Sequence, residues 1–206
     1  ILSIVEVPIG LVVVAFWPAI DPAAIPWVLA AGCTHFAYKF FLTYAYDRGD
    51  LSRVYPIARG AAPMVVALVG AAFLADAVSG RQYLAIAVLA GGILLMARGV
   101  FASGEDRRLL PFALGSALAT ATYTLIDGLG ARVAGDAVAY IAWVFVADGF
   151  MFPIAMIGLR GWPVIPRGLR AWGVGLVASA ASYAAYAVSV WAMTVAPIAL
   201  VAALAL

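Results

Sequence analysis

The stretch LAAGCTHFAYKFFLTYAY, residues 29–46, lines up with LVASAASYAAYAVSVWAM, residues 176–193, at an offset of 147 positions. Three paired alanines and one paired leucine are identical, and two further positions keep an aromatic residue. Upstream, at an offset of 145, Trp17-Pro18 matches Trp162-Pro163 and Pro8-Ile9 matches Pro153-Ile154. An internal repeat in a very hydrophobic chain is typical of transporters built from two related halves. The sequence therefore predicts a duplicated architecture.

The composition indicates that the chain is solvated by lipid. Hydrophobic residues make up 67% of the 206 positions and charged residues only 11%, far from the averages of soluble domains. A net charge of +2 and the absence of a basic run exclude nucleic acid as a partner. The single cysteine excludes an internal disulfide and a cysteine-rich metal site. We predict an integral membrane protein with no metal and no cofactor.

The apolar stretches predict the number of helices. A membrane-spanning helix needs about 20 mostly apolar residues. Seven such stretches and part of an eighth cover residues 1–17, 25–46, 52–74, 81–97, 110–131, 138–159, 169–192 and 196–206. The repeat pairs the first three with the sixth to eighth, and partners five helices apart enter the membrane from opposite sides. We predict an all-α polytopic protein of ten helices in two inverted repeats, here residues 1–103 without the first helix and residues 109–206 without the C-terminal part.

The arginines indicate sidedness. Eight lie in loops on one predicted side of the membrane, and only Arg81 and Arg132 lie on the other. Cytoplasmic loops are enriched in positive charge, so the side with eight arginines is expected in the cytoplasm. Eleven arginines against one lysine are typical of a GC-rich bacterial coding sequence. We expect the inner membrane of a bacterium.

Ionisable side chains inside a membrane are costly and mark candidate functional sites. Five lie far enough inside predicted spans to qualify, namely Glu6, His35, Lys39, Arg59 and Asp148. Lys39 and Arg59 each lie about 10 Å inside the same membrane face, and Glu6 is a candidate counterion for one of them. Structural roles stay open, because both cations can extend to the interface or lock helices together, and His35 can be a packing residue.

Asp148 falls near the bilayer midplane, where a carboxylate cannot reach water by itself. It is expected to be protonated, to pair with Lys39 or Arg59, or to line water. A proton-coupling role and a hydrogen bond between packed helices are the two interpretations. Asp127 lies nearer the end of its helix, which favours a position at the membrane interface.

Four tyrosines lie deep in predicted spans, where each hydroxyl needs a partner. They are candidates for lining a cavity that holds an organic solute: Tyr38, Tyr55, Tyr123 and Tyr183. Pro56 and Pro63 interrupt the third predicted helix, and such interruptions are tolerated only against protein or a wet cavity. The third helix is therefore expected beside the pathway.

One enzyme motif has to be weighed. Residues 127–132, DGLGAR, resemble the opening of the CDP-alcohol phosphatidyltransferase signature. That signature continues with Gly, Asp and Asp at positions where this chain has Ile141, Phe145 and Gly149. Metal-bound diphosphate chemistry needs those carboxylates, so we predict that the chain is not an enzyme. A lipid head-group transferase and a non-transporting membrane scaffold are the alternatives.

Two stretches resemble the EamA-type domain of the drug/metabolite transporter superfamily. They are AYDRGDLSRVYPIARGAAP at residues 45–63 and YTLIDGLG at residues 123–130. The resemblance spans nearly the whole chain and implies ten helices in two inverted repeats around a central cavity. It carries over His35, Tyr38, Tyr55, Arg59, Tyr123 and Tyr183 as substrate contacts. Because both termini of such proteins are drawn in the cytoplasm, it also implies the orientation opposite to the arginine count.

These observations together predict a secondary transporter that moves a small metabolite, such as an amino acid or amine, by alternating access. Arg59 or Lys39 is expected to meet an anionic group of the substrate. Asp148 is the candidate for coupling a proton, with Glu6 and Lys39 as charge partners. The expected partners are the solute, the lipid bilayer and protons, while the oligomeric state stays open.

Overall fold

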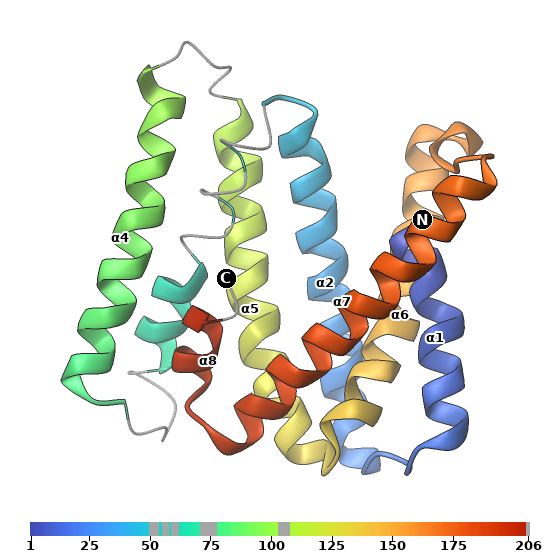
Figure 1. The fold of residues 1–206 in the computed structure, drawn as a ribbon, viewed down its shortest axis with the longest axis horizontal. Coiled ribbons are helices and arrows are strands. Elements are labelled where there is room, and N and C mark those ends of the chain that lie inside the picture. Colours follow the sequence, from blue (N-terminus) through green and yellow to red (C-terminus); the bar gives the residue numbers. More distant parts are fainter. Residues whose placement is uncertain (50–53, 55–57, 59–61, 71–77, 103–107, 205–206) are drawn as a thin grey trace. The chain divides into compact units, whose positions relative to one another are not determined.

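The computed structural model describes residues 1–49, 54, 58, 62–70, 78–102 and 108–204. Over these residues the protein is all-α, with no strand, as the composition predicts. The predicted helix 52–74 lies largely outside the described residues, although residues 62–70 are helical. Figure 1 shows the helices in chain order.

The helix bounds agree with the predicted spans to within a few residues. The main exception is the fourth helix, which continues five residues past its predicted end. The helices are α1 (Leu2–Phe16), α2 (Ile25–Tyr46), α4 (Gly80–Ala102), α5 (Leu109–Ala134), α6 (Ala137–Arg160), α7 (Leu169–Val195) and α8 (Ile198–Leu204). Short 3-10 helices, Pro22–Ala24 and Trp162–Val164, precede α2 and α7. The apolar length of each stretch was enough to locate these helices.

Polar residues and glycines define the ends of the helices. Asp136 is the N-cap of α6, where its Oδ1 accepts a hydrogen bond from the amide of Ala139 at 2.8 Å. Gly135 takes φ of 78° in the two-residue turn between α5 and α6, a conformation that favours glycine. Gly161 ends α6 in the same way, with φ of 77°. The turn between α5 and α6 is therefore fixed by local sequence.

The described chain separates into two compact units. Unit 1 comprises Ile1–Phe36 with Ile126–Thr194, and unit 2 comprises Ala37–Leu125 with Val195–Leu206. Each unit takes segments from before and after the predicted repeat boundary at residues 103–109. A compact unit and a sequence repeat are different properties, so the inverted repeat stays a prediction.

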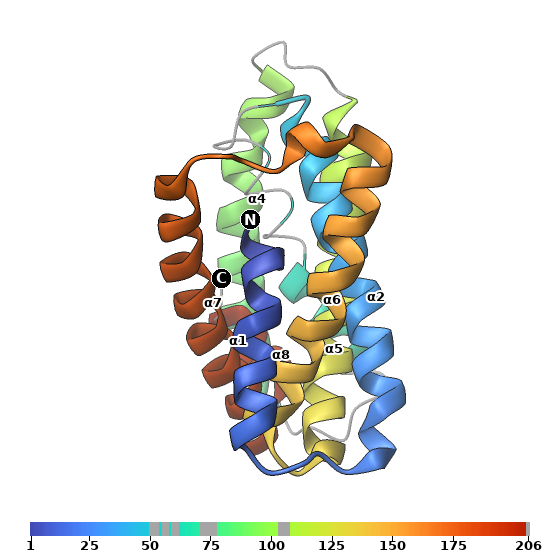
Figure 2. The same cartoon turned by 90° about the vertical axis from the view of Figure 1, so that its right-hand side faces the viewer.

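In unit 1, two glycines allow α1 and α6 to approach closely. A Cβ on Gly10 would lie 2.7 Å from the Ala142 carbonyl oxygen and 2.8 Å from Val146. On the other helix, a Cβ on Gly149 would lie 2.5 Å from Val7 and 2.7 Å from the Ser3 carbonyl oxygen. Figures 1 and 2 both show the two helices side by side. Small residues at such crossings are typical of helix packing in membranes.

The core of unit 1 combines alanines with larger side chains from α2, α6 and α7. Tyr140, Ile141, Val144 and Val190 are fully buried there. Unit 2 has a smaller described core around Leu109 and Ala113 of α5, Ala45 of α2 and Val54. In this unit a Cβ on Gly115 would collide with the ring of Phe41, so α5 lies close to α2 there.

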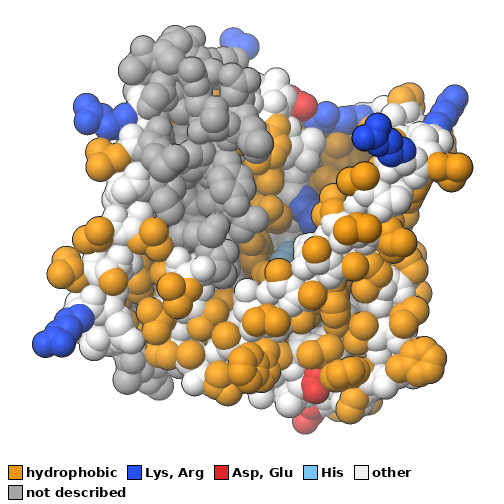
Figure 3. Space-filling view, viewed as in Figure 1, with side chains coloured by type: hydrophobic (Ala, Val, Ile, Leu, Met, Phe, Trp, Pro, Cys, Tyr) orange, Lys and Arg blue, Asp and Glu red, His pale blue; other side chains and the backbone are white. Residues whose placement is uncertain are grey.

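Three helices of the described chain are long and apolar enough to cross a bilayer: α5, α6 and α7. The shorter apolar helix α1 has 15 residues. Figure 3 shows that hydrophobic side chains cover most of α7 on the face drawn, while Lys and Arg side chains gather near its beginning. An apolar surface of this kind is what lipid contact requires, and the protein is an all-α membrane protein.

Candidate functional site

The carboxylate of Asp127 on α5 is a fully buried polar group in unit 1. Its side chain is completely buried, with 0% exposure. The structure shows that this side chain is enclosed by protein, while its expected position at the membrane interface stays a prediction. The helix continues three residues beyond its predicted end, to Ala134, so Asp127 lies seven residues, or roughly 10 Å, from the end of α5.

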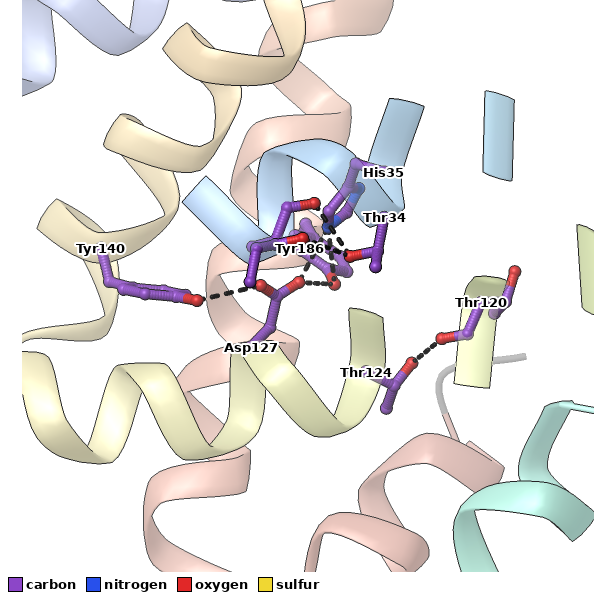
Figure 4. A network of polar contacts seen from close by, with 9 residues as sticks. Thr34, His35, Thr120, Thr124, Asp127, Tyr140 and Tyr186 are labelled. Atoms are coloured by element: carbon purple, nitrogen blue, oxygen red, sulfur yellow. Dashed lines mark hydrogen bonds and ion pairs between the residues drawn. The ribbon is translucent and has the colours of Figure 1, made fainter. Parts of the chain in front are cut away.

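Three side chains surround this carboxylate (Figure 4). His35 Nε2 lies 2.8 Å from Asp127 Oδ2. The Tyr186 hydroxyl donates to the same oxygen at 2.6 Å, and the Tyr140 hydroxyl donates to Oδ1 at 3.2 Å. We call these four residues the Asp127 cluster. All of them belong to unit 1.

Four different helices contribute to the cluster. His35 comes from α2, Asp127 from α5, Tyr140 from α6 and Tyr186 from α7. A buried charge is costly unless it is paired and hydrogen-bonded. One carboxylate thus ties three neighbouring helices to α5, and a movement of any of them away from α5 breaks a contact with Asp127.

Aromatic and glycine contacts hold the donors in place. The Tyr186 ring meets the His35 ring edge-on, with centroids 5.5 Å apart, and lies parallel to Phe145 at 6.2 Å. A Cβ on Gly130, one turn after Asp127, would collide with the Tyr140 hydroxyl. The glycine in the DGLG segment therefore makes room for one of the donors of the cluster.

Among the described residues, His35 is the only predicted substrate contact that lies in this cluster. Tyr183 lies in unit 1 as well, but its hydroxyl donates to the Val138 carbonyl oxygen at 2.8 Å and its ring meets Phe145 edge-on. Tyr38 and Tyr123 contact each other edge-on in unit 2, with ring centroids 5.5 Å apart. The remaining two, Tyr55 and Arg59, lie outside the described residues.

The predicted charge partners are distributed over both units. Glu6 on α1 and Asp148 on α6 are buried in unit 1, with 3% and 2% exposure. Lys39 is half-buried on α2 and belongs to unit 2. Their roles as counterions or as a coupling site stay predictions. Within the described part of the chain, no three His, Cys, Asp or Glu side chains gather in a group that could hold a metal ion.

Sequence reasoning missed Asp127, Tyr140 and Tyr186 as members of a site. Asp127 was visible as a carboxylate in an apolar helix, but its complete burial against other helices was not predicted. His35 is 92 residues away from it in the chain, and nothing in the local pattern pairs the two. The rule that a membrane-buried charge needs a named partner was the signal that could have joined the single histidine to a carboxylate.

A second group of polar side chains lies on α5 in unit 2. Ser116, Thr120 and Thr124 are buried at a spacing of four residues, so they share one face of the helix. The Thr124 hydroxyl donates to the Thr120 carbonyl oxygen at 2.7 Å (Figure 4). Among the described residues, the hydroxyls of Ser116 and Thr120 have no hydrogen-bond partner. Tyr123, which lies on nearly the same face, adds an aromatic ring to this group.

Comparison with known proteins gives no assignment. No family model matches the chain, and no curated protein matches it. The likeness to the EamA-type domain stays a resemblance carried by the two quoted stretches, and the function has to be argued from the contacts.

Proposed function

We propose that the protein is a secondary transporter that moves a small metabolite across a membrane by alternating access. The observation that carries the proposal is the Asp127 cluster. Buried ion pairs are weak contributors to stability, and apolar replacements are often as stable or more so. A carboxylate kept among membrane-embedded helices is therefore better explained by function than by packing.

The cluster also fits the mechanical requirement of alternating access. Such a mechanism needs packed helices with discrete arrangements, between which a bundle rocks around a fixed site. Hydrogen bonds from α2, α6 and α7 converge on one residue of α5, so they are made or broken together. We propose that the cluster stabilises one of the two arrangements.

The hydroxyls on α5 are candidate contacts for the solute. The hydroxyls of Ser116 and Thr120 are buried and make no hydrogen bond to the described protein, which is unfavourable. A bound polar molecule would supply the missing hydrogen bonds. The Tyr38–Tyr123 pair supplies aromatic surface in the same unit. The resemblance adds His35, Tyr55, Arg59 and Tyr183 to the candidate contacts. The substrate class that fits hydroxyls and aromatics is a small polar or amphipathic metabolite, and the bacterial inner membrane is the proposed location.

Neither alternative explains the cluster as well. A head-group transferase built on the DGLGAR segment would need Asp127 to reach a metal, but both of its oxygens already accept hydrogen bonds from the protein. A passive scaffold needs no buried carboxylate at all. Of the three candidate functions, transport is the one that accounts for both Asp127 and the buried hydroxyls of α5.

A ligand screen followed by flux measurement tests the proposal. The purified protein in detergent is screened by thermal shift against amino acids, amines, nucleosides and sugar acids. A ligand at 100 times its dissociation constant adds about 2.7 kcal/mol of stability. Uptake of each hit is then measured in proteoliposomes.

Two variants on α5 make the test specific. The double variant Ser116→Ala/Thr120→Val should lose the thermal shift. Thr122→Val on the same helix should keep it, because Thr122 is exposed and its hydroxyl donates to the Leu118 carbonyl oxygen. A folded protein that binds and moves none of the four classes would contradict the proposal.

A further inference from the structure

The Asp127 cluster consists of titratable side chains in direct contact with one another. We propose that the His35–Asp127 pair binds the proton that drives transport, and that Tyr186 passes this proton to the pair. The inference rests on the proposed transport function and deepens it by naming the coupling ion and its site. It replaces Asp148 as the candidate for proton coupling.

The geometry of the pair suits a single shared proton. Nε2 and Oδ2 are 2.8 Å apart, and the two side chains are buried, with 7% and 0% exposure. Two ionisable groups in such close contact take up and release protons as a pair. Uptake forms one N–H or O–H bond within the pair and breaks one O–H bond of a hydronium ion, which becomes water. The charge of the pair rises by one unit.

Tyr186 is the member of the Asp127 cluster that is least enclosed by the protein. It is only half-buried, whereas the other three members of the cluster are buried. Its hydroxyl oxygen lies 2.6 Å from Asp127 Oδ2 and 3.5 Å from His35 Nε2, so it reaches both partners. A hydroxyl can accept a proton from water while donating its own, which leaves the tyrosine unchanged. The Tyr183 hydroxyl is not placed for this step, because it donates to a backbone oxygen.

Proton uptake changes how firmly the helices are held. Hydrogen bonds to an ionised acceptor are roughly twice as strong as those between neutral groups. When the pair gains its proton, the excess negative charge that Tyr140 and Tyr186 stabilise is removed. Their hydroxyl bonds then weaken, and α6 and α7 are held less firmly to α5. One proton thereby biases the bundle toward its other arrangement, as coupling requires.

Within the described part of the chain, two further titratable side chains contact the pair. Tyr140 faces it from α6 and Tyr186 from α7. Farther along the same helices, Asp148 lies eight residues, about 12 Å, beyond Tyr140, and Arg132 lies five residues beyond Asp127. The Arg132 side chain is directed to α7, where its Nε donates to the Met193 carbonyl oxygen at 2.9 Å. Glu6 is buried on α1 in the same unit.

The chain has only one histidine, which allows a direct test. Protein labelled with ¹⁵N-histidine gives imidazole signals that belong to His35 alone. In the wild-type protein these signals should shift over the pH range in which the protein stays folded. In Asp127→Asn the shift should move to a different pH or vanish. Asp148→Asn, which alters another buried carboxylate of the same unit, should follow the wild type.

Two results in this experiment would overturn the proposal. One is a His35 signal that stays constant with pH in the folded wild-type protein. The other is an unchanged titration in Asp127→Asn. If Asp127→Asn does not fold, Tyr186→Phe replaces it, because this change removes one hydroxyl and keeps the ring. The His35 titration should then move relative to that of Tyr183→Phe, and identical curves would contradict the proposal.

A flux measurement separates this inference from the proposed function. In proteoliposomes loaded with a solute found by the screen, an imposed pH gradient should accelerate transport by the wild type severalfold and leave Asp127→Asn unaffected. If the pH gradient changes the transport rate of neither protein, proton coupling is disproved but the transport function is not. Conversely, a normal His35 titration with no transported solute would disprove the transport function while the proton site remained.

Discussion

Gly130 on α5 faces the hydroxyl of Tyr140 on α6 so closely that even a methyl group does not fit between them. The Gly130→Ala variant should therefore push Tyr140 away from Asp127. Overpacking of this kind costs about 1–3 kcal/mol, and the lost hydrogen bond adds to it. Thermal unfolding in detergent should show a lower midpoint than that of the wild type. Gly158→Ala on α6 is the matched control, because nothing lies within 4 Å of its new methyl group. An equal midpoint for both variants would refute the packing argument.

The crossing of α1 and α6 should be equally sensitive at Gly10. A larger side chain there meets the backbone of Ala142 and the side chain of Val146, and the backbone cannot move aside cheaply. We expect Gly10→Val to lower the free energy of unfolding by about 1–3 kcal/mol or more. Gly173→Val on α7 has open space around it and should unfold like the wild type. If both changes prove harmless, α1 does not pack on α6 through this glycine.

Much of the fold could be predicted because helix location in a membrane protein depends on local apolar length. The predicted span 25–46 coincides with α2, and the spans for α5, α6 and α7 begin within one residue of the observed helices. The helix ends were less certain. The predicted end of α5 fell three residues short of Ala134, so Asp127 lies about one turn farther from the end of its helix than predicted.

The candidate site could be predicted only in part, because its contacts are tertiary. His35 was chosen for being ionisable within an apolar helix, and the structure shows that it is buried against Asp127, while its role in binding a substrate stays a prediction. Tyr140 and Tyr186 look like any other interior tyrosine in the sequence. They belong to the site because their hydroxyls contact a carboxylate on another helix. This contact depends on how the helices are rotated and where they cross, which no local pattern encodes. The proline-interrupted segment with Tyr55 and Arg59 stays a prediction.

A double-mutant cycle on His35 and Asp127 should reveal strong coupling. His35→Leu removes one donor and leaves the carboxylate buried, so it should destabilise the protein by about 3–5 kcal/mol. Asp127→Leu alone leaves the histidine and two tyrosine hydroxyls without their acceptor and should also be costly. The double variant should be more stable than the sum of the single effects predicts, since neither ionisable group is left alone. Additive losses, measured by unfolding in detergent, would show that the two side chains do not interact.

Asp136 links the loop after α1 to the beginning of α6, so its replacement should weaken the structure at both positions. Its carboxylate caps α6 through the Ala139 amide and accepts the Trp17 indole N–H at 3.1 Å on both oxygens. Replacing an N-cap aspartate by alanine costs about 0.5–2 kcal/mol, so Asp136→Ala should lower the unfolding midpoint. Trp17→Phe should cost less, because the cap remains. Asp21→Ala, which affects only a three-residue 3-10 helix, serves as the control. If Asp136→Ala matched this control, α6 would not depend on the cap, and the two-residue turn with Gly135 would be sufficient to start the helix.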